Sequence, residues 1–161
     1  MKLVNIIKNK YKDRCNLESN NNQLMYLHFD CQGEPSTNIC DYYDRLITFT
    51  ECHIYILLVA WCYIDIVMHK HTTLIITKLN FYRIFSQALS MAIKVWDDET
   101  YVHLDKKFCS IAGYSREEFV QLEVIFIQML GFDNMLLDLQ SEIMLKNMEA
   151  FGVHSCNVLQ C

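Results

Sequence analysis

The sequence predicts an all-α fold, and three observations support this prediction. Glycine and proline number only 4 and 1 among 161 residues, which leaves little turn chemistry for a sheet of many strands. Hydrophobic residues make up 52% of the chain and charged residues 20%, a balance typical of a folded globular protein. Apolar residues also recur at helical spacing through much of the chain. A chain of this length most simply forms one domain.

The first predicted helix follows a polar N-terminal segment. Residues 1–34 contain two polar, low-complexity runs, and we expect a mobile or partly helical extension there. The helical pattern begins after Pro35, where residues 36–38 are good N-cap residues. We expect this first helix to end near Thr50.

The second predicted helix, residues 54–68, is apolar on nearly all sides and should be a central element of the fold. It contains 15 residues, including Asp65. A membrane span needs about 20 apolar residues and tolerates a carboxylate poorly. We therefore expect a buried core helix and no membrane partner.

The third predicted helix, residues 81–98, should be packed on most of its circumference. At about 100° per residue its polar side chains share one stripe; they are Arg83, Gln87, Ser90, Lys94 and Asp97. Lys94 is either an ordinary lysine that lays its stem along apolar neighbours or a cation held for a partner.

Two more helices complete the predicted domain. Residues 104–112 form a short helix that Gly113 can end in the left-handed conformation. The fifth helix begins with a capping box, in which Ser115 and Glu118 satisfy each other's backbone donors, and it ends at Leu130. The C-terminal segment, residues 133–161, should add a helix over residues 136–151 and a frayed tail.

Glu123 is the unusual residue of the fifth helix. It lies on the apolar side, roughly opposite the polar positions Glu117, Gln121 and Gln128. An unpaired carboxylate in apolar surroundings is costly, so Glu123 needs a cation or several donors. Lys94 is the candidate. A purely structural ion pair and a binding pair look alike in sequence, so both interpretations stay open here.

Composition and motifs argue against several function classes. The net charge of −5 disfavours a nucleic-acid partner. The eight cysteines include no C-x-x-C pair, and several fall inside apolar helical patterns, which favours buried reduced thiols. The apolar run at the N-terminus is too short for a signal peptide, so we expect an intracellular protein of the nucleus or cytoplasm. His69 and His71 flank Lys70 without a third ligand, so we expect loop surface and no metal or other cofactor. No phosphate loop or hydrolase motif is present, so we expect neither an enzyme nor a small-molecule substrate.

Five blocks of residues stand in a fixed order between Ser36 and Phe132. They are Tyr63-Ile64-Asp65; Leu79-Asn80-Phe81-Tyr82-Arg83; Ala92-Ile93-Lys94-Val95-Trp96-Asp97-Asp98 with Tyr101; Ala112-Gly113; and Glu118 with Leu122-Glu123, Phe126, Leu130 and Phe132. In order and spacing these blocks resemble the cyclin box, specifically that of the single-box P/U-type, or phosphate-signalling, cyclins. The sequence departs from the family pattern at Ile66, where an arginine is usual, and leaves no room for a second complete box.

The resemblance implies a five-helix cyclin box over residues 35–132. Its third and fifth helices would present Lys94 and Glu123 to a cyclin-dependent serine/threonine protein kinase. The positions that match the family's other kinase-binding residues are Val95, Asp97, Ile127 and Phe132. The positions that match its structural motif are Asp65, Asn80, Arg83, Asp98, Tyr101 and Gly113.

The implied function is that of a regulatory subunit. Such a chain binds and activates the kinase as a heterodimer and carries out no chemistry itself. A second hypothesis is a cyclin-fold transcription factor or scaffold without a kinase-activating role. A third is a helical metalloenzyme that uses His and Cys side chains.

Overall fold

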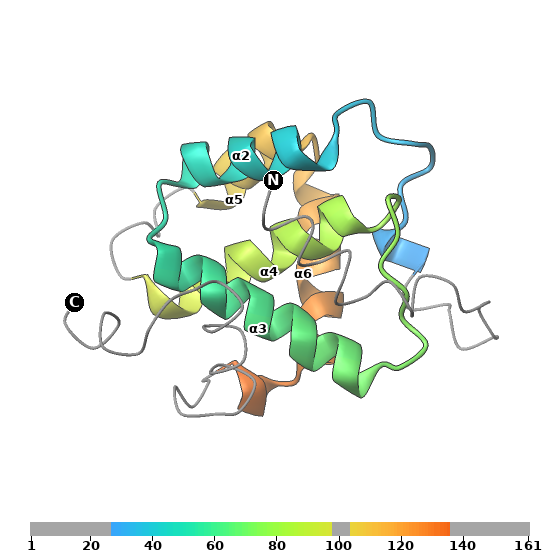
Figure 1. Cartoon of the computed structure of the whole chain (residues 1–161), viewed down its shortest axis with the longest axis vertical. Helices are drawn as coiled ribbons and strands as arrows, with labels where there is room; N and C mark the ends of the chain where they lie inside the picture. Colours follow the sequence, from blue (N-terminus) through green and yellow to red (C-terminus); the bar gives the residue numbers. More distant parts are fainter. Residues whose placement is uncertain (1–26, 98–103, 136–161) are drawn as a thin grey trace.

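The computed structural model describes residues 27–97 and 104–135. Within these ranges it contains five α-helices, two short 3-10 helices and no strand, which confirms the all-α prediction (Figure 1). The elements are η3 (Leu27–Phe29), α2 (Ile39–Thr50), α3 (Ile54–Lys70), α4 (Phe81–Trp96), α5 (Leu104–Ala112), α6 (Arg116–Leu130) and η4 (Phe132–Asn134). The predicted helix over residues 136–151 and the motif positions Asp98 and Tyr101 lie outside the described residues.

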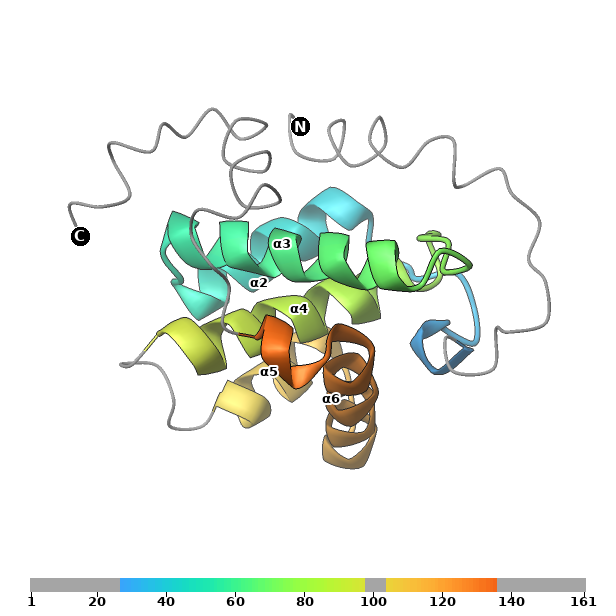
Figure 2. The same ribbon diagram turned by 90° about the horizontal axis from the view of Figure 1, so that it is seen from below.

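The helix α4 is the hub of the fold. It packs against each of the other four helices, and Figure 2 shows it between α2 and α3 on one side and α5 and α6 on the other. Its small residues Ala88, Ser90 and Ala92 are fully buried, which lets these neighbours approach closely. The predicted central helix α3 is also buried on nearly all sides, and it lies along α4.

The polar stripe of α4 faces its helical neighbours. Gln87 and Ser90 are 1% and 0% exposed, and the Gln87 amide donates to the Phe119 carbonyl at 3.4 Å. Lys94 retains only 17% of its side-chain exposure. The stripe therefore lies in the contact with α5 and α6, and Lys94 is not an ordinary solvated lysine.

The predicted capping box of α6 forms only in part, and α4 begins without a side-chain cap. Ser115 accepts the backbone N–H of Glu118 at 3.1 Å, but the Glu118 carboxylate pairs with Arg83 instead of returning to Ser115. Asn80 stands before α4 without capping it. Its side chain turns back to the preceding loop, where it accepts from the Thr77 N–H and donates to the Ile75 carbonyl, both at 2.8 Å.

Other expectations agree with the described part of the chain. Gly113 has φ of 75° at the end of α5, as a left-handed helix stop requires. Cys62 is buried, and the cysteines of the described ranges are free thiols. No helix in these ranges combines the length and hydropathy needed to cross a bilayer.

Candidate functional site

Three helices bring one cation and two carboxylates together. The Lys94 Nζ on α4 lies 2.5 Å from Glu123 Oε1 on α6 and 2.6 Å from Asp105 Oδ1 on α5. The predicted proximity of Lys94 and Glu123 is therefore present. The side chains of Lys94, Glu123 and Asp105 are 17%, 16% and 35% exposed, so this ionic cluster sits at the edge of the core.

The electrostatics of the ionic cluster keep Lys94 charged. Burial acts to lower the pKa of Lys94, but the hydrogen bonds to Asp105 and Glu123 outweigh it and raise the pKa above its ordinary value. The ammonium also lies 5.6 Å from the centroid of the Phe119 ring, within the range of a cation–π contact. Two carboxylates around one ammonium leave an excess of one negative charge at the site.

Asp105 is the member of the cluster that sequence reasoning missed. It stands in the first turn of α5, where an acidic residue is common because it favours the helix N-terminus. That local explanation gives no reason to expect a contact with α4. Only the packing of α5 across α4 reveals the ion pair.

The outer face of α6 carries an exposed apolar strip beside the ionic cluster. Val120 and Val124 are 41% and 48% exposed, and Ile127 is partly buried on the same side. Their spacings of four and three residues place them on one helical face, next to Glu123. Phe132, the first residue of η4, is 75% exposed. We call Val120, Val124, Ile127 and Phe132 the apolar strip.

On α6 the side of the apolar strip that lies away from Glu123 is polar. Glu117, Gln121 and Gln128 are exposed, as the helical wheel predicts. Val124 was not singled out from the sequence, although its spacing from Val120 was the available signal. Exposed apolar side chains with polar groups beside them are typical of a protein-interaction surface.

The other predicted binding positions lie at the end of α4. Val95 and Asp97 are half-buried there, one residue on either side of Trp96, and the Asp97 N–H closes the helix on the Ile93 carbonyl at 2.9 Å. Of the motif positions, Asp65 is half-buried on α3.

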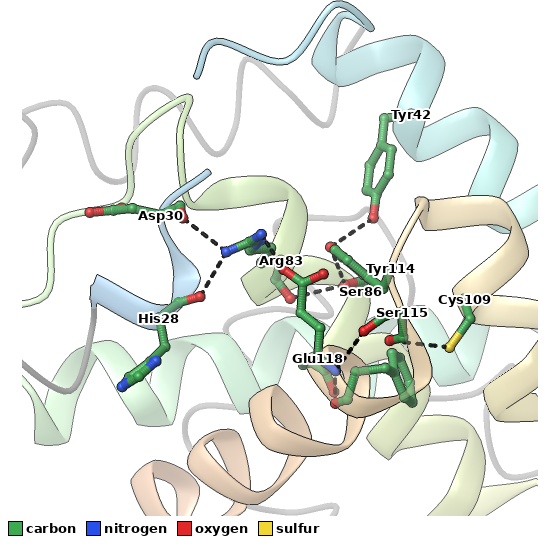
Figure 3. Close-up of polar contacts among 11 residues, drawn as sticks. His28, Asp30, Tyr42, Arg83, Ser86, Cys109, Tyr114, Ser115 and Glu118 are labelled. Carbon is green, nitrogen blue, oxygen red and sulfur yellow. Dashed lines mark hydrogen bonds and ion pairs between the residues drawn. The ribbon is translucent and has the colours of Figure 1, made fainter. Parts of the chain in front are cut away.

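Arg83 is the centre of a second polar network, shown in Figure 3. Its Nη1 donates to the backbone carbonyls of His28 and Asp30, each at 2.9 Å, while Nη2 pairs with Glu118. The guanidinium lies 6.0 Å from the centroid of the Tyr114 ring. Arg83 thus ties the segment around η3 to both α4 and α6.

Buried side chains support this second network. Phe29, beside His28, is fully buried and meets Phe126 edge-on, with ring centroids 6.5 Å apart. The Tyr114 hydroxyl lies 3.1 Å from Ser86 Oγ, and burial raises the pKa of Tyr114. Part of the predicted N-terminal extension therefore belongs to the core, since these contacts fix residues 28–30.

The described residues offer no metal site. No group of three or more His, Cys, Asp or Glu side chains in these ranges is arranged to hold an ion. The ionic cluster instead surrounds one ammonium with two carboxylates and borders an apolar strip, an arrangement suited to contact with another protein.

Comparison with known proteins agrees with this architecture. The family model described as Cyclin matches residues 5–134. Cyclin-U1-1 of Arabidopsis thaliana is 29% identical over 99 residues, which are 61% of this chain and 46% of that protein. Cyclin-P1-1 of Oryza sativa subsp. japonica is 27% identical over 106 residues, 63% of this chain and 38% of that protein.

A further U-type relative gives the same picture. Cyclin-U4-3 of Arabidopsis thaliana is 29% identical over 100 residues, 62% of this chain and 45% of that protein. The matches thus span less than half the length of these relatives, whereas the family model covers most of this chain. On its sequence and on its all-α fold, this chain belongs to the cyclin family, with its similarity to the U- and P-type members.

Proposed function

We propose that this chain is a regulatory subunit that binds and activates a cyclin-dependent serine/threonine protein kinase. The observation that carries the proposal is the ionic cluster of Lys94, Glu123 and Asp105 beside the exposed apolar strip of α6. The end of α4, with Val95 and Asp97, completes the proposed docking surface. An intracellular location in the nucleus or cytoplasm fits this role.

The chemistry of the cluster suits the backbone of a partner. A carboxylate has several acceptor positions, so Glu123 can hold Lys94 and still accept a peptide N–H. The ammonium of Lys94, which also donates to Asp105, can exchange one of its carboxylates for a peptide carbonyl. Charged groups that are already paired and partly desolvated lose less solvation on docking than free ones. The pair would therefore fix the register of a partner helix.

The apolar strip would supply most of the binding free energy. Val120, Val124 and Phe132 together expose an apolar surface of the kind that a helix of the partner can bury. Docking of this kind can hold the regulatory helix of a kinase so that its catalytic Lys–Glu pair forms. The chain itself would contribute no catalytic group.

The alternative is a cyclin-fold scaffold or transcription protein that does not activate a kinase. The exposed strip would serve such a partner as well, but the combination with Lys94 and Glu123 at the family's kinase-binding positions favours the kinase. The net charge of −5 disfavours direct contact with DNA.

A matched pair of substitutions on α6 tests the proposal. Wild-type chain should bind at least one kinase in a panel of purified cyclin-dependent kinases and increase its phosphorylation of a peptide. Val124→Asp places a charge in the apolar strip and should weaken binding about a hundredfold, or about 2.7 kcal/mol. Gln121→Asp adds the same charge on the polar flank and should leave binding nearly unchanged.

Circular dichroism and thermal melting of both variants would confirm that the fold is intact. Failure of the wild-type chain to bind any kinase in the panel would contradict the proposal. Equal binding by the two variants would remove the apolar strip from the interface, and binding without a rise in phosphorylation would favour a scaffold.

A further inference from the structure

The end of α6 is held by the side chains of Lys70, the last residue of α3, and His71, the residue after it. Lys70 Nζ donates to the Leu130 carbonyl at 2.8 Å, and His71 Nε2 lies 3.0 Å from the Met129 carbonyl. Because a carbonyl oxygen only accepts, this second bond requires the proton on Nε2. The last carbonyls of a helix have no partner within the helix, and cationic donors suit them. Lys70 and His71 are thus not plain loop surface, contrary to the expectation from sequence.

The turn after α6 is shaped around this contact. Gly131 has φ of 80°, and a Cβ at this position would lie 2.9 Å from Lys70 Nζ and 3.3 Å from Asn134 Nδ2. Asn134 also donates to the Leu130 carbonyl at 2.8 Å. The absence of a side chain at residue 131 lets both donors reach the helix end. Figure 2 shows the chain turning here from α6 into η4.

A third contact from α3 holds the far end of η4. The Tyr63 hydroxyl donates to the Met135 carbonyl at 2.5 Å and accepts from Trp96 Nε1 at 3.0 Å. Trp96 is the last residue of α4 and follows Val95. One hydroxyl therefore links the end of α4, which belongs to the proposed docking surface, to the end of η4, the short helix that begins with Phe132.

Phe132 needs such support, because its own side chain is 75% exposed. An aromatic group that projects into solvent gains little orientation from core packing, so its place depends on the backbone that carries it. Binding is stronger when such an anchor is already held in its bound position, since less conformational entropy is lost. The contacts from α3 act on both sides of Phe132, at Leu130 and at Met135.

We propose that Tyr63, Lys70 and His71 are positioning residues that fix Phe132 relative to Lys94 and Val95. This inference rests on the proposed function, because it assigns a role in kinase docking. It makes the buried helix α3 the frame that sets the distance between the two halves of the docking surface. None of the three residues needs to touch the kinase.

The first experiment examines the free protein and needs no kinase. Hydrogen exchange of the amides of residues 131–135 should accelerate about threefold to tenfold in Tyr63→Phe and in Lys70→Met, because local opening becomes easier. Tyr55→Phe is the matched control for the first, since the Tyr55 ring packs on the same indole, with centroids 5.9 Å apart. Lys107→Met, at an exposed position of α5, is the control for the second. Unchanged exchange in Tyr63→Phe and Lys70→Met overturns the proposal whether or not a kinase binds.

The second experiment is a double-mutant cycle on kinase affinity. The probe is the kinase of the purified panel that the wild-type chain binds most tightly. Tyr63→Phe should weaken its binding about threefold to tenfold in the wild-type background and less than about twofold in a Phe132→Ala background. An equal loss in both backgrounds would show that Tyr63 does not act through Phe132 and would overturn the inference. Absence of any kinase binding by the wild-type chain contradicts the proposed function instead, and the exchange experiment still decides whether α3 fixes residues 131–135.

Discussion

Two ion pairs join the same face of α4 to α6, and they differ in what surrounds them. Arg83 pairs with Glu118 in the first half of α4, and Lys94 pairs with Glu123 near its end, about three helical turns further on. The cationic side chains are equally exposed, at 17%. The face of the helix and the burial of the cation therefore do not distinguish a structural pair from a binding pair.

The neighbours of each pair distinguish them. Arg83 is enclosed by its own chain, because its Nη1 donates to both the His28 and the Asp30 carbonyls. Lys94 and Glu123 border the exposed Val120 and Val124 instead. The first pair thus fastens the η3 segment to the core, and the second lies where another protein can reach it.

The largest expected effect compares the two pairs in kinase binding. Lys94→Met with Glu123→Met should weaken binding at least about a hundredfold, because the polar contacts with the partner backbone disappear. Arg83→Met with Glu118→Met should change affinity by less than about threefold. Replacing both members of a pair leaves neither member as a buried unpaired charge; Asp105 loses its cation in the first double variant, but its side chain is 35% exposed, so both proteins should fold. Calorimetry on the folded proteins measures the affinities, and a similar loss in both would erase the distinction.

The next effect concerns the stability that Arg83 provides. Arg83→Met should lower the free energy of unfolding by about 2 kcal/mol, because the Glu118 carboxylate and two backbone carbonyls lose a charged donor. Denaturant titration measures the change. Lys78→Met is the control, since Lys78 meets Glu34 at 3.6 Å with both side chains about three-quarters exposed, and such surface pairs contribute little. Equal stability of Arg83→Met and wild type would contradict the proposed role of Arg83 in holding the η3 segment against the core.

Periodicity predicted the helices because it depends only on residues within each helix. The polar stripe of α4 and the misplaced Glu123 were visible in the same way, and the need of a carboxylate for a cation led to Lys94. The fold and the central ion pair were therefore predictable from local pattern and from one energetic rule.

Contacts that depend on how helices cross were not predictable. Asp105 reaches Lys94 only because α5 packs across α4. The Ser115 and Glu118 motif correctly marked the start of α6, yet the guanidinium of Arg83 displaced half of the capping box, because an ion pair is stronger than a bond to a neutral N–H. Lys70 and His71 looked like loop residues since their acceptors lie about 60 residues away in sequence.

A smaller effect on stability tests whether Lys94 needs both of its carboxylates, Asp105 and Glu123, in the folded protein. Asp105 and Glu118 are both 35% exposed, so they form a matched pair. Glu118→Gln should cost about 1.5 kcal/mol, because Arg83 loses its carboxylate, whereas Asp105→Asn should cost about 0.5 kcal/mol, because Lys94 keeps Glu123. Denaturant titration of the two variants gives the comparison. A larger loss in Asp105→Asn would mean that Asp105, and not Glu123, is the main partner of Lys94.

The smallest expected effect is a difference between the Lys94 and Arg83 ion pairs in how their contributions to stability change at alkaline pH. The pKa of Lys94 is raised in the folded state, so its contribution to stability is complete below the unfolded pKa of about 10.5 and is lost as pH rises through the folded pKa. Arginine stays protonated throughout this range, so the Arg83 pair should not respond. Buried tyrosines lower the stability of the wild-type protein in the same pH interval, since the pKa of Tyr63 is raised to about 12. The measurement must therefore be the difference in free energy of unfolding between wild type and each variant.

Between pH 9 and pH 11.5 the stability gap between wild type and Lys94→Met should narrow, while the gap between wild type and Arg83→Met should stay constant. Parallel behaviour of the two gaps would show that the charge of Lys94 contributes nothing to folding stability.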